Sequence, residues 1–426
     1  MTNRFSRMFN LTEAQAIEIL DAPAKDSEEA SNRYIAASHL ANFDSQAAIA
    51  ALIRAVDRSD SDLDNRIVRR KAVESLGRLK ASEAIPAIER ALVDEDNYLV
   101  ENAAWAIGEI GTEETALLEK VAAQLARPDQ SYRTIIQTLA KLGYQPAVEQ
   151  IRPFTHSDQA PIVSAALTAI YRLSGDETAI AKVLPFLQNH NVNARRGSIQ
   201  DLMDANYYLA IEQIASCPVS SVFRLRGVRH LGKFAIDSGK ITFAELQPHL
   251  ESVIRDHPDT VALVHAYDQA PTVPQLIQAL YGTDFGRCYL ASKILIDDHA
   301  EAAPVALLAS YRSDGYNDYG AHYHMMRLFG WLRIKDAYEL LLEALENKAP
   351  QFQKSRTAAA IALGELGETN AIPALISALS VPIWDLQYAA LISLDRLGES
   401  NLRQHFDADF DADVVDWLVK EKLNSL

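Results

Sequence analysis

The sequence predicts an all-α fold, an α-solenoid of stacked helical hairpins, on the basis of three observations. Similar segments return along the 426 residues at intervals of about 30 residues, the length of one helical hairpin. Within these segments Leu and Ile recur at the i, i+3, i+4, i+7 spacing of an amphipathic helix. No stretch sustains an alternation of polar and apolar residues, so we expect essentially no β-sheet.

The clearest copies of the repeat lie at 68–77 and 355–364, and the tetrapeptide Ala-Ile-Pro-Ala follows each. Pro86 and Pro373 then fall in the first turn of the next helix, where proline is tolerated. Glycines that suit a left-handed helix end follow four of the repeats, at Gly111, Gly143, Gly367 and Gly398. Helix ends are expected, in chain order, at Gly77, Gly108, Ala140 and Tyr171, more weakly near Met203, Gly232, Ile296 and Gly330, and again at Gly364 and Asp395.

These elements predict a single solenoid over residues 1–426. Its repeats are regular at about 65–175 and about 350–400, and irregular between. Repeats tend to depart from their consensus where function requires other residues. We therefore expect the ligand-binding part in the irregular middle, at about 190–335.

Composition narrows the functional class. The chain has 41 Lys and Arg against 57 Asp and Glu, a formal charge of −16, so nucleic acid is not an expected partner. Cys217 and Cys288 form no metal-ligand pattern, and we predict no metal site. No apolar run reaches the roughly 18 residues of a membrane span, so a soluble, cytoplasmic protein is expected.

The most unusual stretch is 311–331, which gathers tyrosines, histidines, aspartates, arginines and a tryptophan. Its first part is typical of a loop, and a helix is expected to open near Ala321. One interpretation is that Asp318 caps this helix and the rings are core. The other is that Tyr316, Asp318 and Tyr319 contact a ligand, because one cap does not need so many polar residues.

A basic strip crosses the irregular middle of this acidic chain: Arg195, Arg196, Arg224, Arg226, Arg229, His230, Arg287 and, beside the last, Tyr289. Its arginines either pair with an aspartate of a neighbouring repeat or form fixed guanidinium forks for an anion with two carboxylates. The candidates chosen from the strip are Arg195, Arg224, Arg226, Arg287 and Tyr289. Trp105, in a helix of small residues, is open to both packing and ligand contact.

The repeat pattern resembles the HEAT-like repeat. In that family the helix that begins Val-Arg-x-x-Ala lines the concave face of the solenoid. The resemblance therefore implies a column of concave side chains, one from each repeat: Arg69, Val100, Tyr132, Val163, Arg195, Arg224, Cys288, His322, Arg356 and Gln387.

Over nearly its full length the chain resembles the phycobilisome lyases of the E/F type. It is most similar to the long single-chain branch that serves phycoerythrin alpha subunits (CpeY, MpeZ and MpeQ type). The helix 101–108 and the run 316–331 are the specific parts of the resemblance. Members bind phycoerythrobilin, an open-chain tetrapyrrole (a bilin), and join it by a thioether to a cysteine of the apo-subunit. Some also isomerise it to phycourobilin.

The resemblance implies a bilin lyase, with or without isomerase activity. Phycoerythrobilin is then the substrate, no cofactor is tightly bound, and the apo-phycoerythrin alpha subunit is the partner. Asp318 and Tyr319 are the predicted catalytic residues: the first accepts pyrrole N–H groups, and the second moves a proton as the partner's thiolate adds to the pigment. The predicted bilin-binding residues are Tyr316, His322, Arg195, Arg224, Arg226, Arg287, Tyr289 and Trp105.

A different class of protein also fits the repeat. A non-catalytic HEAT-repeat scaffold, or a chaperone-like helper for phycobiliprotein assembly, needs the same helices but not the polar run at 316–319. The sequence leaves open whether attachment is accompanied by isomerisation.

Overall fold

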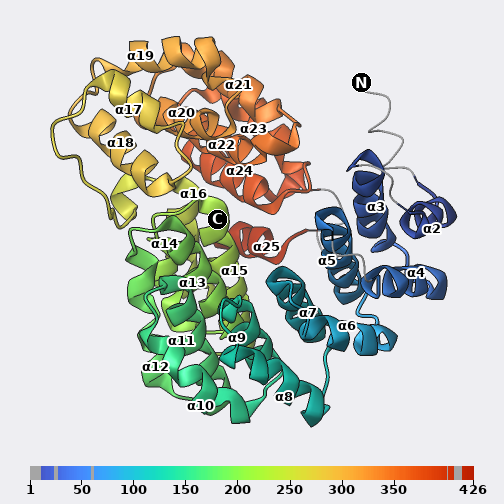
Figure 1. The fold of residues 1–426 in the computed structure, drawn as a ribbon. Helices are drawn as coiled ribbons and strands as arrows, with labels where there is room; N and C mark the ends of the chain where they lie inside the picture. The colour runs from blue at the N-terminus through green and yellow to red at the C-terminus, as the bar shows by residue number, and fades with distance from the viewer. Residues whose placement is uncertain (1–10, 24–26, 59–61, 401, 407–414) are drawn as a thin grey trace. The chain divides into compact units, whose positions relative to one another are not determined.

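The computed structural model describes residues 11–23, 27–58, 62–400, 402–406 and 415–426. Every regular element in these ranges is helical, so the prediction of an all-α solenoid fold without sheet is confirmed there. Contacts divide the chain into two compact units, Met1–Lys182 and Val183–Leu426 (Figure 1). The sequence predicted a single array and did not show this division, which falls near the start of the irregular middle.

Unit 1 is a stack of helical hairpins in two layers. In one layer α3, α5, α7, α9 and α11 each contact the next, and in the other α2, α4, α6 and α8 do so. The helices are α2 (Glu13–Asp21), α3 (Ser27–Leu40), α4 (Gln46–Val56), α5 (Leu63–Arg78), α6 (Ile85–Leu92), α7 (Asn97–Ile110), α8 (Thr115–Ala123), α9 (Tyr132–Lys141), α10 (Val148–Ile151), α11 (Ala160–Ser174) and α12 (Glu177–Ala181), with 3-10 turns η1 (Ser82–Ala84), η2 (Gln124–Ala126), η3 (Gln145–Ala147) and η4 (Arg152–His156).

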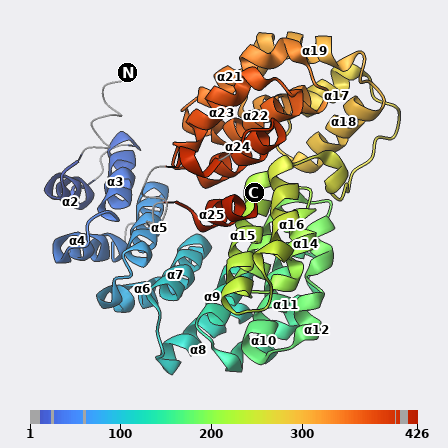
Figure 2. The same cartoon turned by 180° about the vertical axis from the view of Figure 1, so that it is seen from behind.

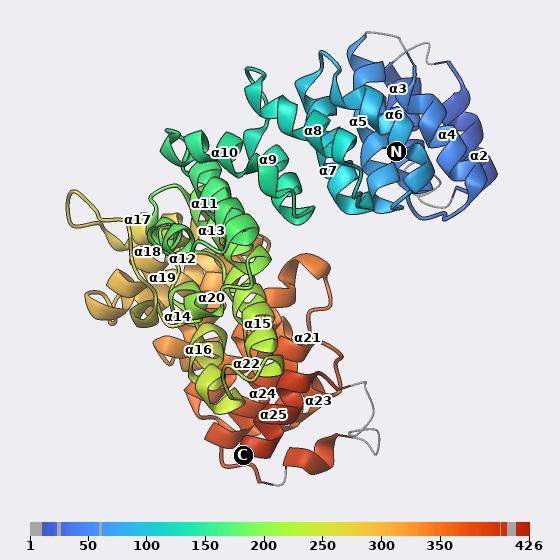
Figure 3. The ribbon, with the colours of Figure 1, turned by 90° about the horizontal axis from the view of Figure 1, so that it is seen from below.

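Unit 2 continues the hairpin pattern. Contacts join α13 to α15, and they join α18, α20, α22 and α24 in series (Figures 2 and 3). Its α-helices are α13 (Val192–Asp204), α14 (Ile211–Ala215), α15 (Ser221–Asp237), α16 (Phe243–Arg255), α17 (Val273–Ala279), α18 (Phe285–Asp297), α19 (Ala303–Ser310), α20 (Tyr319–Trp331), α21 (Tyr338–Glu346), α22 (Gln353–Leu366), α23 (Ile372–Leu379), α24 (Trp384–Arg396) and α25 (Trp417–Ser425).

Short turns connect the helices of unit 2. They are η5 (Leu184–Gln188), η6 (Tyr208–Ala210), η7 (Pro258–Thr260), the π-helical turn η8 (Tyr311–Gly315), η9 (Lys335–Ala337), η10 (Pro350–Phe352), η11 (Thr369–Ala371) and η12 (Leu402–His405). Helix α16 contacts both α22 and α24, and α25 packs on α24. No helix in the described ranges is long and apolar enough to cross a membrane.

The helix boundaries follow the local signals in the sequence. Helices α5, α7, α9 and α11 end within three residues of the predicted positions. Pro86 and Pro373 lie in the first turns of α6 and α23. The glycines after the helices have positive φ, a conformation that side chains with a Cβ rarely adopt: 84° at Gly111, 67° at Gly143, 75° at Gly367 and 81° at Gly398.

The predicted concave column is instead largely buried between the two helix layers. All of its polar members except His322, whose ring meets the hydroxyl of Tyr311, donate hydrogen bonds to carbonyls at or near the end of the preceding helix. The bonds run from Arg69 to Val56 (2.9 Å), from Tyr132 to Arg127 (2.8 Å), from Arg195 to Asn189 (2.6 Å), from Arg224 to Ala215 (3.1 Å), from Cys288 to Ala279 (3.4 Å), from Arg356 to Leu345 (2.8 Å) and from Gln387 to Leu379 (2.8 Å). This column is therefore a structural device, which corrects its assignment to the concave surface.

The Gln387→Leu variant tests this device. Leucine fills similar space but leaves the buried carbonyl of Leu379 without its donor, so we expect a loss of about 1–3 kcal/mol in the free energy of unfolding. Urea denaturation followed by circular dichroism measures the change. Gln278→Leu, at an exposed position of α17, is the control and should lie within about 0.5 kcal/mol of wild type. Equal stabilities of the two variants would contradict the role of Gln387.

Candidate functional site

A cavity of about 840 Å³ lies within unit 2, between the first turns of its helices. This volume is in the range of roughly 300–1,000 Å³ typical of small-molecule sites. Its walls combine positive charge with aromatic surface in a chain of net charge −16. The cations are Arg196, Arg226, Arg229 and Lys354, the rings are Phe223, Phe285, Tyr319 and Trp384, and the acid is Asp385.

Four of the lining residues lie about one helical turn before the buried column. Each stands three positions before its column residue: Phe285 before Cys288, Tyr319 before His322, Gln353 before Arg356, and Trp384 before Gln387. Because the column side chain is buried, other positions face the cavity: the one a turn earlier in α18, α20, α22 and α24, and Arg196 and Arg226, just after the column residues, in α13 and α15.

The arginines of the cavity differ in how far they are already paired. Arg229 forms an ion pair with Asp416, 2.5 Å long, and its guanidinium stacks on Trp384. Arg196 donates to the carbonyl of Thr283 at 3.2 Å. Arg226, which the sequence predicted, is exposed and has no described ion pair or hydrogen bond. It is therefore the arginine most available to a carboxylate of a ligand.

Lys354, in the first turn of α22, is enclosed by aromatic rings. Its Nζ lies 4.4 Å from the ring centre of Phe285, 4.5 Å from that of Tyr319 and 5.0 Å from that of Tyr323. These are cation–π distances. Burial lowers the pKa of Lys354 to about 8, from an ordinary value near 10.5. Sequence reasoning missed this residue, since nothing in its own segment distinguishes it from a surface lysine.

Asp385 is the carboxylate of the cavity wall. It lies in the first turn of α24 and accepts a hydrogen bond of 3.0 Å from the hydroxyl of Thr357. Burial raises its pKa above the ordinary value, although the hydrogen bond from Thr357 acts in the opposite direction. An acceptor in such a position suits a ligand that carries N–H groups. Sequence reasoning missed Asp385, because Trp384 and Asp385 stand in a regular repeat.

The two predicted catalytic residues lie at the start of α20. Asp318 is its N-cap: one carboxylate oxygen accepts the backbone N–H groups of Gly320 at 2.9 Å and Ala321 at 2.7 Å. The capping interpretation is thus correct for Oδ1, while Oδ2 makes no described hydrogen bond. Tyr319 lines the cavity, with half of its surface exposed (52%) and its ring against Lys354. The cap holds the tyrosine at the cavity edge.

Arg224 and Tyr289 lie beneath the cavity, not in its wall. Both are fully buried and both bind the carboxylate of Asp256, which also accepts from the hydroxyl of Tyr323. Burial, and to a smaller extent the negative charge of Asp256, raises the pKa of Tyr323 to about 12. A guanidinium that is fully buried and already paired with a carboxylate is not accessible to a propionate. The prediction that Arg224 and Tyr289 contact the pigment therefore has to be corrected.

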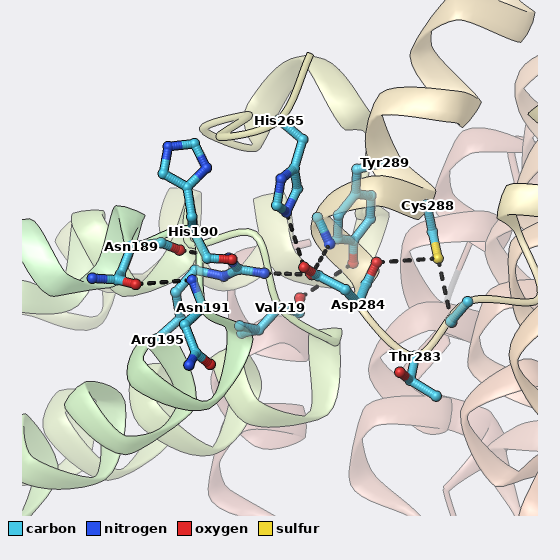
Figure 4. A network of polar contacts seen from close by, with 12 residues as sticks. Asn189, His190, Asn191, Arg195, Val219, His265, Thr283, Asp284, Cys288 and Tyr289 are labelled. Atoms are coloured by element: carbon cyan, nitrogen blue, oxygen red, sulfur yellow. Dashed lines mark hydrogen bonds and ion pairs between the residues drawn. The ribbon is translucent and has the colours of Figure 1, made fainter. Parts of the chain in front are cut away.

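Arg195 is committed in the same manner (Figure 4). Its guanidinium is buried, donates to the carbonyls of Asn189 and His190, and pairs with Asp284. Asp284 also binds His265 at 2.9 Å and accepts the N–H of Gly286 at 2.9 Å. The cluster ties α13 to the start of α18, so Arg195 is structural, which corrects its predicted contact with the pigment. The cavity uses its neighbour Arg196.

Four other predicted residues lie in separate places. Tyr316 and His322 border another depression of unit 2, of about 350 Å³. Burial lowers the pKa of His322 to about 4, so its ring is neutral at pH 7. Arg287 is exposed and borders a depression of about 270 Å³. Trp105 belongs to unit 1, where its ring packs so closely on α5 that a Cβ at Gly77 would lie 2.8 Å from it.

Comparisons with known proteins agree with this architecture. Residues 61–129 match the model of HEAT repeats, and residues 355–380 match the model of the PBS lyase HEAT-like repeat. The phycocyanin operon protein Y of Pseudanabaena tenuis, described as uncharacterized, is 53% identical over 425 residues, 100% of each chain. The bilin biosynthesis protein CpeY of Synechococcus sp. is 34% identical, covering 89% of this chain and 92% of that protein.

A solved structure is also similar. It is the complex of CpcE and CpcF of phycocyanin lyase from Nostoc sp., matched with 25% identity and a TM-score of 0.49 over 57% of this chain and 95% of that chain. Fold and repeats together define the class, a HEAT-repeat protein of the PBS lyase kind. Within this class, the chain belongs to the E/F-type bilin lyase family, together with bilin biosynthesis protein CpeY.

The buried carboxylate below the cavity gives a stability prediction. Asparagine tolerates the backbone of Asp256 (φ 53°), so Asp256→Asn removes the charge and leaves Arg224 buried and unpaired. We expect a loss of about 3–5 kcal/mol in the free energy of unfolding, measured by urea denaturation. The control Asp237→Asn breaks an exposed pair with Lys233 and should cost at most about 1 kcal/mol. If the two variants unfold alike, Asp256 is not the support described.

Proposed function

We propose that this protein is a bilin lyase that attaches phycoerythrobilin by a thioether bond to a cysteine of a phycoerythrin alpha subunit. The observation that carries the proposal is the cavity of unit 2, where cations and aromatic rings meet within an acidic protein of the E/F-type family. The binding of an open-chain tetrapyrrole with two propionates requires both cations and aromatic rings. Aromatic walls cover its face, and fixed cations pair its carboxylates.

The cavity residues divide the work as follows. Arg226 binds a propionate, because its guanidinium is exposed and has no described partner. Tyr319 and Phe285 cover the pigment, with Tyr319 at the exposed edge where the partner subunit approaches. The pyrrole N–H groups find acceptors in Asp385 of the cavity wall and in Oδ2 of Asp318, the residue before the lining residue Tyr319. The nucleophile belongs to the partner.

The two thiols of this chain support the assignment of the nucleophile to the partner subunit. Cys217 and Cys288 are both buried, and burial raises the pKa of each to about 12. A thiol with so high a pKa holds almost no thiolate near neutral pH, and the thiolate is the reactive form. The enzyme therefore contributes binding, orientation and proton transfer, and the sulfur of the product comes from the phycobiliprotein.

The proposal is tested by co-expression with the phycoerythrin alpha subunit and a supply of phycoerythrobilin. The absorbance of the purified, denatured subunit then reports covalent pigment. A phycoerythrobilin spectrum supports the lyase, and a blue-shifted phycourobilin spectrum adds the isomerase activity that the family resemblance implies. A parallel culture with a phycocyanin alpha subunit tests the acceptor. Colourless subunits in all cultures would favour the scaffold or helper function.

Asp318→Asn is the informative variant in this assay. Asparagine caps a helix about as well as aspartate, so the start of α20 and the melting temperature should be kept while the charge is lost. We expect covalent attachment to fall by about 10- to 100-fold if the carboxylate acts on the pyrrole N–H groups. Attachment at the wild-type level would assign Asp318 to capping alone and leave Asp385 as the acceptor.

Arg226→Glu and Arg287→Glu form a matched pair for pigment binding. Both arginines are exposed in unit 2, and both changes alter the net charge equally, but only Arg226 lines the cavity. We expect Arg226→Glu to weaken the non-covalent binding of phycoerythrobilin by about tenfold or more, an effect of at least about 1.4 kcal/mol. Absorbance titration of the purified protein measures it. Equal weakening of binding by Arg287→Glu would show that the pigment does not bind in this cavity.

A further inference from the structure

Lys354 is the one cationic side chain of the cavity that is able to release a proton. The arginines that share the wall keep their charge under all ordinary conditions. Lys354 is also held in one place, since the rings of Phe285, Tyr319 and Tyr323 surround its Nζ at 4.4–5.0 Å. In the described part of the chain no carboxylate forms an ion pair with it. Its ammonium group therefore opens onto the cavity without a fixed acceptor.

We propose that Lys354 is the general acid of the attachment reaction, the residue that gives a proton to the pigment as the partner's thiolate adds. This inference rests on the proposed function and adds to it a residue to which neither the sequence nor the family resemblance assigned a role. It moves the proton donation from the hydroxyl of Tyr319 to the amine beneath its ring. Tyr319 then covers the ammonium and the face of the pigment.

The step balances without any further reactant. The thiolate sulfur of the partner forms a bond to the outer carbon of the ring A ethylidene, and the electron pair of that double bond moves to the ring carbon. The ring carbon takes a proton from Nζ of Lys354, which becomes a neutral amine and regains a proton from water. The net change is addition of S–H across one C=C bond, with no oxidation or reduction.

The surroundings of Lys354 suit such a donor. Burial lowers its pKa to about 8, so at neutral pH it is mostly protonated yet releases a proton far more easily than an exposed lysine. Its aromatic and neutral neighbours are Phe285 and Cys288 on α18, and Tyr319, Tyr323 and His324 on α20. The charged groups that act on it are Asp256 after α16 and Asp318 before α20, which raise its pKa, and Arg196 on α13, which lowers it. Asp385 shares the cavity wall from α24.

The test compares Lys354→Arg with Lys335→Arg, a matched change at an exposed lysine that pairs with Glu368. Purified enzyme is loaded with phycoerythrobilin and mixed with apo-phycoerythrin alpha subunit across a pH series on both sides of 8. The rate of covalent attachment is read from the denatured subunit, non-covalent binding from absorbance, and folding from the melting temperature. Arginine keeps the positive charge and the cation–π contacts but does not donate the proton.

The expected result separates the chemistry from binding. Wild type and Lys335→Arg should lose rate as the pH rises through about 8, since the ammonium form is the active one. Lys354→Arg should bind phycoerythrobilin within about threefold of wild type, melt at the same temperature, attach the pigment about 100-fold more slowly, and lack the decline above pH 8.

Other results would overturn the assignment in distinguishable ways. Lys354→Arg with the wild-type rate would show that only the positive charge matters and that the proton comes from elsewhere. If Lys354→Met and Lys354→Arg both lose pigment binding, Lys354 is an anchor and not the acid. A wild-type protein that neither binds nor attaches the pigment would defeat the proposed function itself, and the role of Lys354 with it.

Discussion

A helix that ends inside a packed layer leaves its last carbonyl groups without partners, and this chain satisfies them with a side chain from the next helix. The same position of the repeat supplies the donor in seven repeats, from Arg69 in unit 1 to Gln387 in unit 2. Arginine, tyrosine, cysteine and glutamine all serve, so the constraint is a donor of sufficient reach and not one residue type. Because this side chain is buried in the fold, the cavity is lined by neighbouring positions, such as Tyr319 one turn before His322 and Arg226 two residues after Arg224.

In the repeat that contains Arg224, the donor side chain makes additional bonds. There the donor reaches two carbonyls and also the carboxylate of Asp256, a residue in the left-handed conformation at the end of α16. Tyr289 from α18 and Tyr323 from α20 meet the same carboxylate. One buried acid thus fixes three helices that present side chains to the cavity. A site held in this way has little to reorganise when a ligand binds, which is a general requirement for tight and oriented binding.

The sequence predicted what depends on local chemistry and missed what depends on neighbours. Helix ends, first-turn prolines and positive-φ glycines were correct because each is determined within a few residues. The helix cap at Asp318 was also predicted, as one of two interpretations. The role of Lys354 was not, because its environment is built by rings from α18 and α20. Arg224 and Arg226 look equivalent in the sequence, yet one is buried and paired and the other is exposed, since two positions on a helix face different ways.

The last helix of the chain also has a part in the electrostatics of the cavity. Asp416, at the start of α25, neutralises Arg229 in the cavity wall, and Lys422 of the same helix binds Glu251 of α16 at 2.9 Å. A chain shortened before Asp416 would therefore keep every cavity residue but present one more unpaired positive charge to a ligand. The charge balance of the cavity wall thus depends on a residue that is distant in the sequence and belongs to none of the helices that line the cavity.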